Sequence, residues 1–139
     1  MARVDVPARI RLERLARILA LTGGLSWIVK ILLIWENGGT NTFGGAVGLM
    51  FLIGTVLLAS ATVLWTWHAT GGRSLLMRAG LLLGALIVLL LAINLPILVG
   101  LSVLPGSWLA GEFGVIFVAV AAIIAASGVT GLRTITSRV

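Results

Sequence analysis

The sequence predicts an all-α integral membrane protein, with four transmembrane helices in an up-down antiparallel bundle and both termini in the cytoplasm. Composition is the first reason: 60% of the 139 residues are hydrophobic, 10% are charged, and the mean hydropathy is +1.20. A soluble domain carries about a quarter charged residues. The chain also contains four apolar runs, each close to the length of about 20 residues that crosses a hydrocarbon core.

The distribution of basic residues predicts the orientation. Nine of the ten basic residues flank the apolar runs on one side: Arg3, Arg9, Arg11, Arg14, Arg17, Arg73, Arg78, Arg133 and Arg138. This is the positive-inside pattern of short cytoplasmic loops. The net charge of +6 could also suggest nucleic-acid binding. Such a basic footprint normally comes with a soluble recognition fold, so we expect no nucleic-acid partner.

We therefore expect one membrane domain over residues 1–139 of a multi-pass protein of the cell membrane. Residues 1–14 form a basic cytoplasmic segment, and the spans cover about 16–36, 46–67, 76–101 and 109–129. The first apolar run is too long for the core of a cleaved signal peptide. Four arginines before or at the start of this run are expected to contact anionic lipid headgroups: Arg9, Arg11, Arg14 and Arg17. They serve as a topology anchor or, alternatively, as a regulatory lipid sensor.

The first span contains Lys30, the only lysine of the chain and the only cation inside an apolar run. A lysine near the middle of a membrane helix costs about 2.5–3.5 kcal/mol on insertion scales, so it usually pairs, snorkels or lines a wet cavity. Side chains of a helix tilt toward its N-terminus. That direction leads Lys30 away from the nearer, outer interface at Trp35. We therefore predict a charged partner rather than snorkelling.

The second span ends in Trp65, Trp67 and His68, as expected where amphipathic rings gather at the membrane interface. A histidine could exchange protons near neutral pH, but its place at the helix end favours an interfacial role. The third span contains Asn94 and, two residues later, Pro96. We expect Pro96 to kink the helix. Asn94 either forms an interhelical hydrogen bond or belongs to a broken-helix pathway of the transporter type.

The fourth span contains Glu112, the only acid inside an apolar run of the last three spans. Lys30 lies five residues before Trp35, and Glu112 lies four residues after Trp108. At 1.5 Å per residue, both lie roughly 6–8 Å below the outer tryptophan level. We therefore predict an ion pair between Lys30 and Glu112, within one chain or between copies. Glu36 is unsuited because it lies about 240° around the helix from Lys30.

Small residues recur at four-residue spacing in every span and permit close helix contacts. The pairs and triplets are Ala16, Ala20 and Gly24; Gly44 and Gly48; Gly80 and Gly84; Ala121 and Ala125; Ala122 and Ala126. One four-helix bundle does not obviously use all these faces. A surplus face suggests association with another copy or with another membrane protein.

These features favour an accessory or scaffolding membrane subunit that associates with itself or with a larger membrane complex. Its expected partners are membrane lipids and other membrane-protein subunits. The alternative is a component of a small oligomeric transporter or channel that uses Lys30, Asn94 and Glu112 as an intramembrane polar site. An enzyme is not expected, because one histidine, four acids and no cysteine offer no catalytic constellation, no metal site and no cofactor site.

Overall fold

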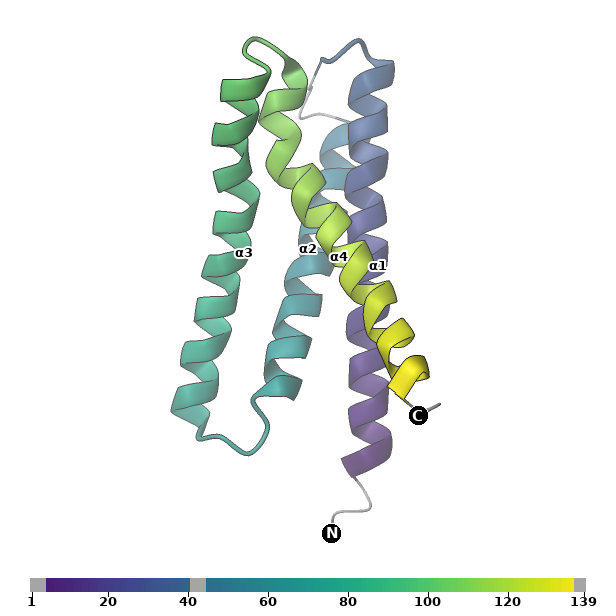
Figure 1. Cartoon of the computed structure of the whole chain (residues 1–139), viewed down its shortest axis with the longest axis vertical. Helices are drawn as coiled ribbons and strands as arrows, with labels where there is room; N and C mark the ends of the chain where they lie inside the picture. The colour runs from purple at the N-terminus through teal and green to yellow at the C-terminus, as the bar shows by residue number, and fades with distance from the viewer. Residues whose placement is uncertain (1–4, 41–44, 137–139) are drawn as a thin grey trace.

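The structure, a computed structural model, describes residues 5–40 and 45–136, with side chains described over 11–40 and 45–127. This part of the chain is all-helical (Figure 1). The helices are α1 (Asp5–Glu36), α2 (Ala46–Ala69), α3 (Leu75–Val103) and α4 (Trp108–Thr136). All four are long and apolar enough to cross a membrane. They therefore indicate a multi-pass membrane protein.

Short turns connect the helices, and serines cap the starts of two of them. Ser74 caps α3, because its hydroxyl accepts a hydrogen bond from the Met77 backbone N–H at 3.4 Å. Ser107 does the same before α4, accepting from the Leu109 N–H at 3.2 Å. Gly106, in the turn before Ser107, has a φ of 82°. This left-handed conformation suits glycine, which has no Cβ to oppose it.

The core lies where α1 packs against α2 and α4, whereas α3 packs mainly against α4. In Figure 1, α4 begins beside the end of α3 and runs obliquely toward α1. The central cluster of buried residues consists of Trp27, Leu58, Val115, Val118 and Ala119. A second cluster contains Ala20, Ala61 and Ala126. The alanines are typical of contacts between membrane helices, where small residues let the helix backbones approach each other.

Glycines permit the closest of these helix contacts. A Cβ added at Gly24 of α1 would lie 3.0 Å from the Ala119 carbonyl oxygen of α4. A Cβ at Gly114 of α4 would run directly into the backbone carbonyl of Ile93 in α3. A side chain at Gly114 would therefore force α3 and α4 apart, and one at Gly24 would press on the backbone of α4.

Hydroxyl side chains in the helices, and that of Thr70 directly after α2, bond back to the helix. Each of six donates to the carbonyl four residues earlier, at 2.6–2.8 Å: Thr22, Thr55, Ser60, Thr62, Thr70 and Ser127. Lipid hydrocarbon offers no hydrogen-bond partner, so a polar group at depth has to be satisfied within the protein. These six hydroxyl groups meet that requirement through the helix backbone.

Candidate functional site

The ion pair predicted between Lys30 and Glu112 is present. The ammonium Nζ of Lys30 donates to Oε2 of Glu112 at 2.7 Å, which joins α1 to α4. Both residues are buried, with 4% of Lys30 and 6% of Glu112 exposed. Glu36, the acid on the same helix as Lys30, is exposed. Depth relative to the tryptophans Trp35 and Trp108 thus predicts the partner correctly.

One aromatic ring of α2 lies against the cation, and a ring of α1 stacks on that ring. Lys30 Nζ lies 4.8 Å from the centroid of the Phe51 ring, within the range of a cation–π interaction. Phe51 in turn stacks on Trp27, with ring centroids 5.8 Å apart and planes inclined by 9°. The indole Nε1 of Trp27 donates to the Phe51 backbone carbonyl at 3.1 Å. The pair and the two rings therefore connect α1, α2 and α4 at one depth.

Gly54 makes room for this arrangement. A Cβ at Gly54 of α2 would collide with the indole ring of Trp27, which is only 1% exposed. Sequence reasoning did not identify Trp27, Phe51 or Gly54. The available signals were that Trp27 lies three residues before Lys30, hence on a similar helix face, and that Gly54 lies one turn after Phe51.

Asn94 does not join the Lys30 and Glu112 pair. It is exposed on α3, and its side-chain Nδ2 donates to the Leu90 carbonyl of its own helix at 2.7 Å. The structure therefore separates the three residues grouped in the predicted polar site into a buried pair and one outward-facing amide. α3 is assigned as a continuous helix with Pro96 inside it, and the kink at Pro96 stays a prediction.

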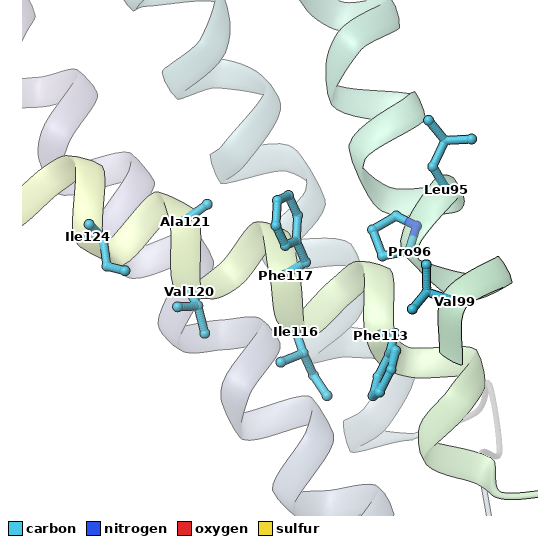
Figure 2. A pocket seen from close by; sticks show the side chains of 9 residues that line it. All are labelled: Leu95, Pro96, Val99, Phe113, Ile116, Phe117, Val120, Ala121 and Ile124. Atoms are coloured by element: carbon cyan, nitrogen blue, oxygen red, sulfur yellow. The ribbon is translucent and has the colours of Figure 1, made fainter. Parts of the chain in front are cut away.

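Pro96 lines an apolar pocket between α3 and α4 (Figure 2). The pocket has a volume of about 750 Å³ and is lined by Leu95, Pro96, Val99, Phe113, Ile116, Phe117, Val120, Ala121 and Ile124. A second apolar pocket of about 430 Å³ lies among all four helices and includes Leu58, Trp65 and Val118. Neither pocket is lined by Lys30, Asn94 or Glu112, so neither forms a polar binding site with them.

The arginines at the start of α1 have mixed environments. Arg11 and Arg14 are exposed, as contact with lipid headgroups requires. Arg17 is half-buried and forms an ion pair with Glu13 at 3.6 Å. The side chain of Arg9 lies outside the described residues. Lipid contact at these positions stays a prediction.

Some of the predicted small-residue faces lie in contacts between helices, and others do not. Ala16, Ala20 and Gly24 are buried in the contacts of α1. In contrast, a Cβ added at Gly80 or Gly84 of α3 would meet no atom within 4 Å. The face of α3 that carries these two glycines therefore packs against nothing in the described part of the chain.

Known proteins add no constraint on this site. Comparison with protein-family models, with curated proteins and with solved structures finds no match to this chain. Among the described residues, no group of three or more histidine, cysteine, aspartate or glutamate side chains could hold a metal ion. The site is thus characterised by its geometry: a buried ion pair bordered by the Phe51 ring, on which Trp27 stacks.

Proposed function

We propose that this chain is an accessory or scaffolding subunit of a membrane complex, rather than an enzyme. The observation that supports this most is the state of the buried polar groups. Among the described residues, Lys30, Thr70 and Glu112 are the buried polar or charged ones. Lys30 and Glu112 bond to each other, and Thr70 bonds to the Thr66 carbonyl. The pair joins α1 to α4, and the Thr70 hydroxyl is satisfied by the backbone of α2. Buried polar groups that bond to the protein itself suit a structural subunit.

In this proposal the chain lies in the cell membrane as an up-down antiparallel bundle with both termini in the cytoplasm. The one-sided distribution of arginines supports the orientation. The connections between helices support the antiparallel order, since short turns join helices that run in opposite directions.

The test is recovery of partners from native membranes. A tagged full-length chain is solubilised in a mild detergent, and co-purifying proteins are identified and quantified. We expect the same few membrane proteins in fixed ratio to the chain. The double variant Lys30→Met/Glu112→Leu, which replaces the pair by apolar side chains, should recover them in the same ratio. Isolation of a monomer without partners in fixed ratio would contradict the proposal.

The alternative function, a transporter or channel component using Lys30, Asn94 and Glu112, requires water to reach the ion pair. Ile34 lies one helical turn after Lys30 and is fully buried. Under the scaffolding proposal, Ile34→Cys should resist a water-soluble thiol reagent in intact membranes, whereas Thr40→Cys in the exposed loop should react. The chain has no native cysteine, so each variant reports one position. Rapid labelling at position 34 would favour transport.

A further inference from the structure

The face of α3 opposite its contact with α4 has a regular pattern. Seven positions alternate in steps of four and three residues along it: Gly80, Gly84, Ile87, Leu91, Asn94, Leu98 and Leu101. We call these seven residues the α3 seam. Steps of four and three are the spacing by which two helices pack in a left-handed coiled coil. A face with this spacing can therefore pack against another helix.

Nothing in the described part of the chain covers this seam. Leu98 is 65% exposed, whereas Gly100, about 200° around the helix, is buried against Ala110 of α4. Ile87, Leu91 and Leu101 are also exposed, and open space surrounds Gly80 and Gly84. α3 thus packs on one side and leaves the seam outward.

Asn94 is the polar residue of this otherwise apolar face. Its position is nine residues before Val103, the end of α3, or about 13 Å along the helix. It therefore lies within the hydrocarbon region. One amide N–H of Asn94 is used by the Leu90 carbonyl, and no other hydrogen bond of this side chain occurs among the described residues. The second N–H and the carbonyl oxygen Oδ1 remain available.

A second copy of the chain can satisfy these groups by symmetry. Copies inserted in the same orientation bring their α3 helices together in parallel, so that each residue meets its own counterpart at the same depth. A side-chain amide is both donor and acceptor, so Asn94 of each copy can donate to the other. A single asparagine in such a seam also selects the register of parallel helices.

We propose that the α3 seam is a parallel homodimer interface in which the Asn94 amides of two copies bond to each other across a two-fold axis. The inference deepens the scaffolding function, and rests on it, by naming the partner of one helix face. Gly80 and Gly84 allow the backbones to approach toward the start of α3, and Leu91 and Leu98 pack on either side of the amides.

The test is disulfide cross-linking of the full-length chain in native membranes and in detergent. Leu98→Cys places a thiol on the seam. Val99→Cys is the matched control, because it lies at the same depth, is 57% exposed and faces about 100° away. We expect a cross-linked dimer from Leu98→Cys and none from Val99→Cys. Equal cross-linking of both, or of neither, would overturn the proposal.

Asn94→Leu in the Leu98→Cys background tests the amide itself. This substitution makes α3 more apolar, so the monomer should still insert and fold. We expect the dimer dissociation constant in detergent to rise roughly 3- to 30-fold, as for the loss of an interhelical hydrogen bond. Asn94→Gln, which keeps the amide, should retain more dimer than Asn94→Leu. An unchanged dissociation constant for Asn94→Leu would overturn the role of Asn94.

The outcomes distinguish this inference from the scaffolding function on which it rests. If Leu98→Cys cross-links only to a different membrane protein, and the purified chain is monomeric, the homodimer is wrong and the scaffolding function is supported. If the homodimer forms but no other protein is recovered in fixed ratio, the dimer is supported and association with a larger complex is contradicted.

Discussion

Lys30 on α1 and Glu112 on α4 form a 2.7 Å ion pair between residues that are 82 positions apart in the chain. The pair is buried within the bundle and bordered by the Phe51 ring of α2. Attraction between charges is strong in such a low-dielectric setting, but so is the cost of leaving either charge alone. The pair therefore makes the contact between the first and last helices obligatory once the chain is folded.

Removal of one member of the pair should be strongly destabilising. Glu112→Gln leaves the Lys30 ammonium buried without its counter-charge, and we expect a loss of about 3–5 kcal/mol in the free energy of unfolding. The measurement is denaturant unfolding in detergent micelles, followed by circular dichroism. Glu36→Gln is the matched control, because Glu36 is an exposed acid on the same helix as Lys30. A loss for Glu112→Gln no larger than that of the control would contradict the prediction.

Replacement of both members should be much less harmful than replacement of either. The double variant Lys30→Met/Glu112→Leu removes the two charges together and leaves apolar side chains in an apolar core. Such exchanges are often neutral or stabilising by about 1–4 kcal/mol. The same unfolding measurement, completed as a double-mutant cycle with the two single variants, gives the coupling energy. Additive losses would show that the pair does not act as a unit.

Gly54→Ala should displace Trp27 from its buried position. The added methyl group collides with the indole ring, so the ring has to move and its bond to the Phe51 carbonyl is strained or lost. Overpacking of this kind costs about 1–3 kcal/mol. Unfolding free energy and tryptophan fluorescence provide the readout. Gly111→Ala is the control, because a Cβ at Gly111 in α4 meets no atom within 4 Å; it should not lower the unfolding free energy and should leave the fluorescence unchanged.

Arg78 should hold the connection between α2 and α3 in place. Its guanidinium carbon lies 3.4 Å from the Trp67 ring centroid, and its Nη2 donates to the Trp67 carbonyl at 2.8 Å. Arg78→Lys keeps the charge, and hence the topology signal, but loses the planar stacking and the fork of donors. We expect faster amide hydrogen exchange over residues 70–74. Arg73→Lys changes an exposed arginine of the same connection and should have little effect. Equal hydrogen exchange in the two variants would contradict the role of Arg78.

Single cysteines test the orientation of the bundle. With the termini in the cytoplasm, Thr40→Cys in the first connection should react with a membrane-impermeant maleimide added outside intact cells. Ala69→Cys, at the end of α2, should react only after the membrane is opened. Both positions are exposed, so accessibility alone does not separate them. Labelling of position 69 from outside intact cells would show that the orientation is opposite to the one proposed.

The sequence was informative where polar residues lie within apolar runs. Lys30 and Glu112 could be matched by depth because tryptophans mark the membrane interface near each of them. The rotation of α3 could not be predicted in the same way. Lipid and protein core are both apolar, so hydropathy does not distinguish the face of a helix that meets lipid from the face that meets its neighbours.

Asn94 illustrates this limit. A polar residue at depth is expected inside the bundle, and the sequence grouped Asn94 with the ion pair on that basis. The structure instead turns α3 so that Ile93 and Gly100 meet α4, which leaves Asn94 outward. In this rotation the Ile93 carbonyl approaches Gly114 closely, which the absence of a Cβ at Gly114 permits. The buried face of α3 is thus the one with close backbone contacts at Gly100 and Gly114, and not the one that carries the polar residue.

The pairing of the first helix with the last also bears on how the protein is made. Lys30 leaves the ribosome 82 residues before Glu112. At translation rates of about 5–20 residues per second, that interval lasts about 4–16 s. During this interval the nascent chain contains Lys30 in α1, whereas Glu112 of α4 has not yet been synthesised. A ribosome stalled between the third and fourth spans would thus leave an incomplete product with an uncompensated charge in its first span.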